Sequence, residues 1–115
     1  MAEIKRGDIY LTELDPVIYS EPDVINSVLV IQNDIANQYA PTTIVAAITS
    51  QTSKAKLPTR IKLNKKNFGL DKDFVILLEQ IRTVDKRHLR EKVGSIDEET
   101  MQKVSEALMI SQGIK

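Results

Sequence analysis

The sequence predicts a mostly-β domain with short helices, in which a strongly curved antiparallel sheet or small barrel precedes one terminal helix. Three observations lead to this prediction: short apolar runs rich in β-branched residues, turn-forming residues between them, and a change to helical spacing near the end of the chain. A chain of 115 residues is long enough for one hydrophobic core and short for two, so we expect a single domain over residues 1–115.

Five segments are predicted to be strands. Each is a short apolar or alternating run bounded by proline, glycine or polar residues. The segments are residues 9–14, 28–31, 43–48, 60–63 and 74–78, of which the last is the most apolar and the predicted central strand. Gln32, Asn33 and Asp34 are expected to end the second strand in a turn.

The end of the chain is predicted to form an amphipathic helix. Met101, Val104 and Leu108 recur at helical spacing after Asp97, a residue type that caps helix N-termini. Two glutamates follow Asp97 directly, where the helix dipole favours negative charge. A short charged helix is also expected near residues 85–89.

Composition narrows the class of protein. The chain has no cysteine, which excludes disulfides and thiolate metal sites. No apolar stretch has the length of a signal peptide or a membrane span, so we expect a cytoplasmic protein with no membrane association.

Charge is unevenly distributed along the chain, although the formal net charge is zero. Residues 51–92 hold 12 Lys/Arg against 5 Asp/Glu, whereas residues 1–50 hold 2 against 7. A basic centre of this kind can attract a phosphate backbone, and solvated strand edges explain the charge equally well.

Few residue types remain for catalysis. His88 is the only histidine, and no glycine-rich phosphate loop is present, so we expect an enzyme of this sequence to work without a metal or nucleotide cofactor. His88 itself lies among charged residues and is better explained as part of a solvated helix face than as a catalytic base. The candidates are therefore polar residues that end apolar strands: Asp34, Thr49 and the pair Glu79 and Gln80, which also suit simple strand termination.

Several segments, taken in order, resemble one known family. They are residues 7–10, 28–34, 43–51, 54–59 and 75–86, within a similarity that runs from Lys5 to Ser111. The chain resembles the MazF toxins of Gram-positive bacteria, of the MazF/PemK family. The resemblance implies a small SH3-like barrel of the CcdB/PemK type, a homodimer, and metal-independent, sequence-specific cleavage of single-stranded mRNA. It also implies neutralisation by a cognate MazE-like antitoxin, with operator DNA bound only through the antitoxin complex.

The resemblance assigns roles to particular residues. Thr49 occupies the catalytic threonine position of the family. An RNA-binding role is implied for residues beside it and along the groove: Ser20, Glu21, Ser50, Glu79, Gln80 and Arg82. Asn26 stands at the position of the family's catalytic arginine, in a loop that departs from the family's usual pattern.

Asn26 leaves two hypotheses open, because RNA cleavage without metal needs positive charge beside the phosphorane, and asparagine carries none. In the first hypothesis the protein is an active or weakly active endoribonuclease, in which Arg82 or Arg60 replaces the lost charge. In the second it is a dimer that binds antitoxin, operator complex or RNA without cutting.

Overall fold

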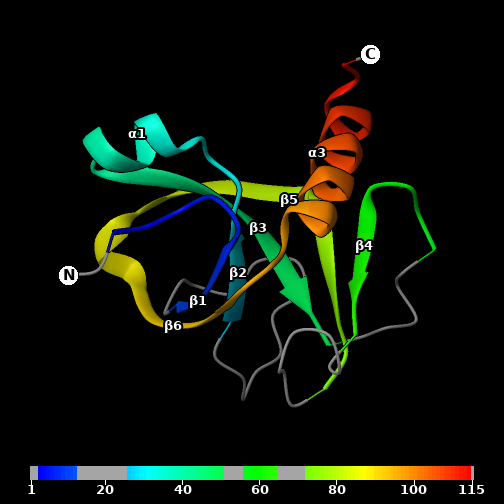
Figure 1. Ribbon diagram of the computed structural model, residues 1–115, viewed down its shortest axis with the longest axis horizontal. Helices are drawn as coiled ribbons and strands as arrows, with labels where there is room; N and C mark the ends of the chain where they lie inside the picture. Colours follow the sequence, from blue (N-terminus) through cyan, green and yellow to red (C-terminus); the bar gives the residue numbers. More distant parts are fainter. Residues whose placement is uncertain (1–2, 13–25, 51–55, 65–71, 115) are drawn as a thin grey trace.

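The computed structural model describes residues 3–12, 26–50, 56–64 and 72–114. Within these ranges the chain forms one six-stranded sheet, two α-helices and a short 3-10 helix (Figure 1). The strands are β1 (Asp8–Thr12), β2 (Asn26–Val30), β3 (Thr42–Thr49), β4 (Arg60–Leu63), β5 (Phe74–Asp85) and β6 (Leu89–Ser95); the helices are α1 (Asp34–Tyr39), η2 (Lys86–His88) and α3 (Glu98–Gln112). The mostly-β prediction is confirmed.

The sheet is antiparallel throughout, in the order β4-β5-β3-β2-β1-β6. The strand predicted at 74–78 is the first part of β5, which pairs with both β4 and β3 and is therefore interior. It is not the middle strand, because β4 beside it forms the edge of the sheet. β5 also continues to Asp85, since its second half pairs with the beginning of β3.

The terminal helix α3 begins as predicted. The Asp97 carboxylate accepts a hydrogen bond from the Thr100 backbone N–H at 2.8 Å, which satisfies a donor that the first turn leaves free. Gly113 ends the helix in the left-handed conformation, with φ 73°, which glycine adopts without steric cost.

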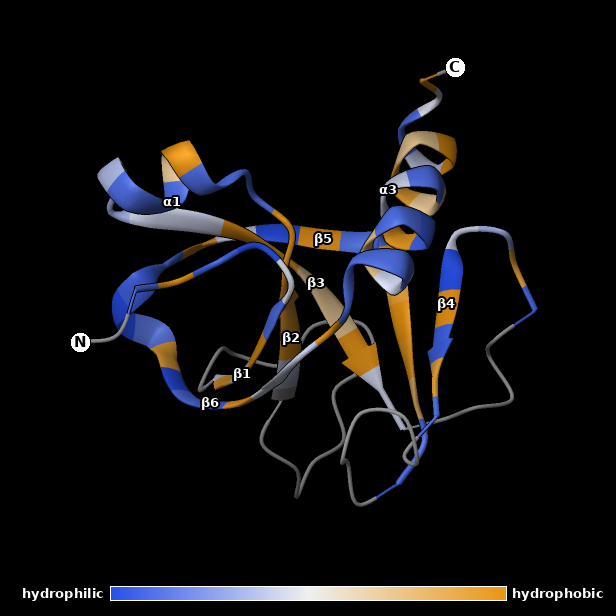
Figure 2. Cartoon of the chain, viewed as in Figure 1, coloured by the Kyte–Doolittle hydropathy of each residue, from blue (hydrophilic) through white to orange (hydrophobic). Residues whose placement is uncertain are grey.

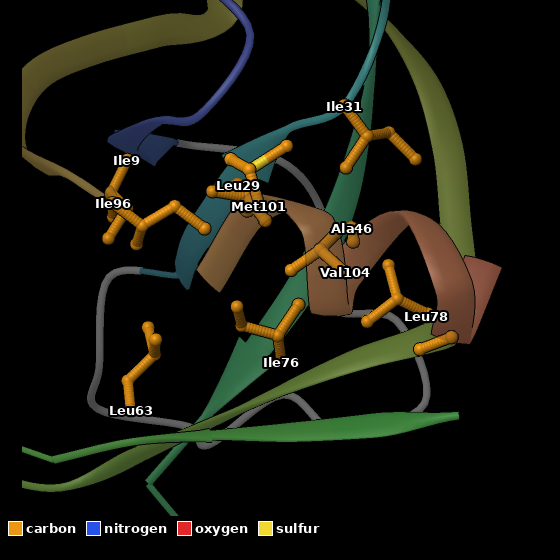
Figure 3. Packing of buried hydrophobic residues seen from close by; sticks show 11 residues of the cluster. Ile9, Leu29, Ile31, Ala46, Leu63, Ile76, Leu78, Ile96, Met101 and Val104 are labelled. Carbon is orange, nitrogen blue, oxygen red and sulfur yellow. The ribbon is translucent and has the colours of Figure 1, made fainter. Parts of the chain in front are cut away.

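One face of the sheet carries α3, and we call it the helix face (Figure 1). Polar and apolar residues alternate along α3 (Figure 2), and its buried residues Met101, Val104 and Ala107 belong to the cluster between the helix and the strands. Met101 and Val104 enter a buried cluster with Leu29 of β2 and with Ile76 and Leu78 of β5 (Figure 3). Burying side chains of this size contributes about 1.5–3 kcal/mol each, so this cluster is a main source of stability.

The opposite side of the sheet we call the far face. It has a buried cluster of its own, to which β1, β2, β3, β5 and β6 contribute. The cluster consists of Ile4, Tyr10, Val28, Val30, Val45, Val84 and Leu89. Successive residues of a strand alternate between the two faces, so these clusters tell which face each strand residue occupies.

Two elements, α1 and β6, lie outside the predicted set. The turn expected at residues 32–34 is instead the start of α1, with Asn33 as its N-cap. β6 pairs with β1 along the edge of the sheet, and Leu89 is its only buried residue, so its sequence has no apolar run that indicates a strand. No helix in the described ranges is long and apolar enough to cross a membrane.

Candidate functional site

Thr49 is the last residue of β3 and lies on the far face. It is directly opposite Val75 of β5, and its neighbour Ile48 packs against the cluster under α3. Only 4% of Thr49 is exposed, so its hydroxyl is held in one environment. Ser50 follows it and is half-buried.

Asn26 is brought beside Thr49 by the register of the sheet. It begins β2 and is opposite Thr12 of β1. On its other side β2 pairs with β3 through Ser27 and Ile48, and one further step of this antiparallel register puts Asn26 opposite Thr49. Directly opposed residues are about 4.5–5.5 Å apart between Cα atoms, so the two positions that the resemblance marks as catalytic are backbone neighbours.

β5 contains a bulge directly before Ile81. Ala47 is opposite Leu77 and Ala46 is opposite Ile81, so the intervening residues 78–80 have no partners on β3. The backbone N–H of Leu78 donates instead to the Thr59 carbonyl at 2.9 Å, and its side chain is buried on the helix face. Bulges re-aim the side chains beside them, and here Glu79 is directed toward the start of β4.

Glu79 is held by two residues of that segment. The Arg60 Nε donates to Oε2 of Glu79 over 2.8 Å, and Nη2 of Arg60 lies 2.7 Å from the same oxygen. The Thr59 hydroxyl donates to Oε1 over 2.9 Å. The side chains of Arg60 and Glu79 are 14% and 26% exposed, which makes this a partly buried pair rather than a solvated one.

These contacts keep Glu79 ionised. Burial acts to raise the pKa of its carboxyl, but the hydrogen bonds from Arg60, from its own backbone N–H and from Thr59, together with the Arg60 charge, lower the pKa below its ordinary value. A carboxylate of this kind is a weak base and a strong hydrogen-bond acceptor. It also neutralises Arg60, whose charge is then shared with Glu79 rather than available in full to a phosphate.

Gln80 and Arg82 continue along β5. Gln80 is half-buried, and Arg82 is exposed and opposite Val45 on the far face. Val45 is four residues from Thr49 along β3, which corresponds to about 13 Å. Arg82 is therefore on the same face as Thr49 but too far away to share one phosphate with it.

Lys62 also lies on this face, although no pattern in the sequence indicates it. It is opposite Val75 on β4, and Val75 is opposite Thr49 on β3, so the three form one row across the sheet. Lys62 is exposed, and no carboxylate of the described residues forms an ion pair with it. Only the pairing of β4 with β5 reveals this position, because Lys62 and Thr49 are distant in the sequence.

The remaining predicted residues do not add to this arrangement. Ser20 and Glu21 lie outside the described residues. His88 is exposed on η2, and its carbonyl accepts a hydrogen bond from the Thr12 hydroxyl at 3.0 Å. In the ranges that the structure describes, no three His, Asp or Glu side chains are grouped so that they could hold a metal ion.

Comparison with known proteins identifies similar sequences over almost the whole chain. Residues 5–111 match the model of a family described as the PemK-like, MazF-like toxin of type II toxin-antitoxin system. The chain is 56% identical over 108 residues to the Endoribonuclease EndoA of Bacillus subtilis (strain 168), covering 94% of this chain and 93% of that protein.

Solved structures of low sequence identity share the fold. An endoribonuclease in complex with its cognate antitoxin from Mycobacterial species is 20% identical with a TM-score of 0.76, over 100% of this chain and 98% of that chain. MazE-MazF (Form-II) from Deinococcus radiodurans is 18% identical with a TM-score of 0.77, over 100% of both chains. The barrel-type fold expected from the resemblance is thus confirmed.

Proposed function

Because the chain belongs to the PemK-like, MazF-like toxins of type II toxin-antitoxin systems, we propose that it is an endoribonuclease that cleaves single-stranded mRNA at a short sequence. The observation that carries the proposal is the 56% identity, over 94% of this chain, to a protein named as an endoribonuclease. We treat residues 1–115 as one domain, the toxin component of such a system. Its place of action is the cytoplasm, where mRNA is found.

The proposed reaction is attack by a ribose 2′-hydroxyl on the adjacent phosphorus. The bond from the 2′-oxygen to phosphorus forms while the bond from phosphorus to the 5′-oxygen breaks. The 2′-proton passes to water or a basic side chain, and the 5′-oxygen receives a proton. A 2′,3′-cyclic phosphate and a 5′-hydroxyl result, and hydrogen-bond donors and positive charge beside the phosphorus stabilise the transition state.

Thr49 is the residue that we assign to this phosphate. Its hydroxyl can donate to a phosphate oxygen, and its burial at the end of β3 holds it in place. Asn26 contributes the neighbouring catalytic position, with a polar amide where the family has a charged guanidinium. We assign RNA binding to Ser20, Glu21, Ser50, Glu79, Gln80 and Arg82.

We further propose that the protein acts as a homodimer and is neutralised by a MazE-like antitoxin, through which it reaches operator DNA. Large apolar side chains are exposed on both α-helices, including Ile35 (76%), Tyr39 (77%) and Ile110 (54%), and a dimer can cover such surface. Two structures of the same fold are described as complexes with an antitoxin or as MazE-MazF. A monomeric mass at micromolar concentration in analytical ultracentrifugation would argue against the homodimer.

A second candidate function is antitoxin or RNA binding without cleavage, and the observation that favours it is Asn26. Asparagine keeps a hydrogen-bonding group but removes a charge that can clamp two phosphate oxygens. By analogy with loss of one oxyanion donor, the cost is on the order of 10²–10³ in rate.

One experiment distinguishes the two functions. Purified protein is incubated with a long single-stranded RNA in the presence of a chelator, and the products are separated on a sequencing gel. Cleavage at a few defined sites, lost in Thr49→Ala, supports the endoribonuclease. Absence of cleavage together with tight binding of an antitoxin peptide supports the binding function instead.

A further inference from the structure

The contacts around Glu79 suggest a role for Arg60 that no resemblance supplies. Arg60 and Thr59 direct three donor contacts at the two oxygens of Glu79: Nε at 2.8 Å and Nη2 at 2.7 Å to one oxygen, and the Thr59 hydroxyl at 2.9 Å to the other. The backbone N–H of Glu79 also donates to this carboxylate, but 26% of the side chain is exposed, so a donor that approaches from outside can still reach its oxygens.

The location of Glu79 decides what that donor can be. Ile61 packs against the cluster on the helix face, so its neighbour Arg60 on β4 lies on the far face, and Glu79, which Arg60 holds, lies there with Thr49. Val75, which is opposite Thr49, is four residues from Glu79, or at most about 13 Å along β5. An RNA strand whose scissile phosphate lies at Thr49 thus brings a neighbouring nucleotide, rather than that phosphate, to Glu79.

The charge of Glu79 decides which groups of the nucleotide can donate a hydrogen bond to it. A carboxylate repels phosphate and has no hydrogen to donate, so it binds the amino or imino hydrogens on a base edge. Adenine, cytosine and guanine have amino groups on their Watson–Crick edges, and single-stranded RNA exposes these edges to proteins. Uracil offers one imino hydrogen between two carbonyl oxygens, which a carboxylate disfavours.

We propose that Arg60 is a positioning residue for RNA recognition: with Thr59 it holds Glu79 as a fixed, ionised acceptor that selects an amino-bearing base next to the cleavage site and rejects uracil there. This inference rests on the proposed endoribonuclease function. It assigns Arg60 to base recognition through Glu79, and not to the replacement of the charge missing at Asn26.

The test compares the parent with Arg60→Met, Arg60→Lys and Glu79→Gln on RNAs that differ only in the base at each position flanking the cut. Arg87→Met is the matched control, because Arg87 also pairs with a carboxylate, Asp85 at 2.9 Å, but is 88% exposed on η2. Cleavage kinetics are measured for each RNA. Binding is measured in parallel with RNAs that carry a 2′-deoxyribose at the cut and so remain intact.

At one flanking position we expect the parent to prefer an amino-bearing base over uracil by on the order of 10-fold or more. Arg60→Met should raise KM and reduce this preference while kcat changes little, because Glu79 acts away from the reacting atoms. Glu79→Gln should tolerate uracil, since an amide can also donate. Arg60→Lys should restore part of the preference, and Arg87→Met should match the parent.

Two results would overturn the inference. One is an Arg60→Met variant with the parent's KM and base preference; the other is an equal fall of kcat on every RNA, which indicates a purely structural role. If the parent cuts no RNA, the proposed function fails, and the intact RNAs still report the preference. Equal binding of uracil and amino-bearing bases by the parent then overturns the inference by itself.

Discussion

Lys62 and Thr49 lie in one cross-strand row of the sheet, with Val75 between them. Two interstrand spacings separate their Cα atoms, about 10 Å, and an extended lysine side chain covers more than half of that distance. Among the described residues that carry positive charge on the far face, Arg60 is paired with Glu79 and Arg82 is farther from Thr49. Of these described cations, Lys62 is therefore the one best placed to meet the RNA backbone near Thr49.

Replacing Lys62 by glutamine should weaken RNA binding about equally for all sequences, because a phosphate contact carries no base information. One lost contact should also reduce the slope of log affinity against log salt concentration by about 0.7 for a single strand. The measurement is fluorescence anisotropy with uncleavable RNA at several salt concentrations. The control is Lys103→Gln on α3, which removes the same charge from the other side of the sheet and should leave the slope unchanged. If Lys62→Gln also leaves the slope unchanged, Lys62 does not contact the RNA backbone.

Gly7 should not tolerate a side chain. Its φ of 98° is disfavoured for other residues, and an added Cβ would lie 3.4 Å from Cγ of Met101 in the core. Gly7→Ala should lower the free energy of unfolding by about 1–3 kcal/mol, measured by urea denaturation. Gly94→Ala is the matched control, since its Cβ meets nothing within 4 Å, and a change within about 0.5 kcal/mol is expected. Equal stability of the two variants would contradict the strain argument.

Part of the stability should depend on pH through Glu79. Burial acts to raise the pKa of Glu79, but the contacts with Arg60 and Thr59 lower it below the ordinary value of 4.5. A group with a lowered folded-state pKa stabilises the protein above its unfolded pKa, and this contribution disappears as pH falls through the folded value. Glu79→Gln should therefore cost about 1 kcal/mol at pH 7 and progressively less below pH 4.5.

Denaturation curves at pH 7 and pH 3 test this, with Glu106→Gln on the exposed side of α3 as the control. If Glu79→Gln lowers the free energy of unfolding by the same amount at both pH values, Arg60 and Thr59 do not stabilise the charged form of Glu79.

Regular elements were predictable where local pattern and long-range packing agree. β4 has the predicted bounds because apolar and polar residues alternate along it. α3 begins after Asp97 as predicted, because an N-cap residue followed by apolar residues at helical spacing is also a local signal. α1 was not predictable in this way. Its large apolar side chains, Ile35 and Tyr39, are exposed, and its one buried residue is the polar Asn37.

Asn37 stabilises α1 through partners outside the helix. Its side-chain oxygen accepts hydrogen bonds from Gln32 at 3.0 Å and Thr43 at 2.7 Å, and its amide donates to the Gln32 carbonyl at 2.9 Å. Hydrophobic periodicity contains no trace of such a network. The pairing of Arg60 with Glu79 was not predictable from hydrophobic periodicity either. It depends on the bulge in β5, where residues 78–80 have no partners on β3.

Asn26 and Thr49 provide the most decisive prediction for the site. If only the phosphate clamp is missing, Asn26→Arg should raise RNA cleavage on the order of 10²–10³-fold, because a guanidinium opposite Thr49 can bind two phosphate oxygens and stabilise the transition state. Asp23→Gly is a useful second change, since a carboxylate three positions before residue 26 in the sequence can pair with the new arginine and withhold it from the phosphate. Initial rates on one RNA in chelator measure the gain, and Thr49→Ala in the Asn26→Arg background should abolish it. The opposite outcome is that the parent already cleaves RNA quickly and that Asn26→Arg does not increase the rate. If Lys62→Gln or Arg82→Gln then stops cleavage, another cation already supplies the charge.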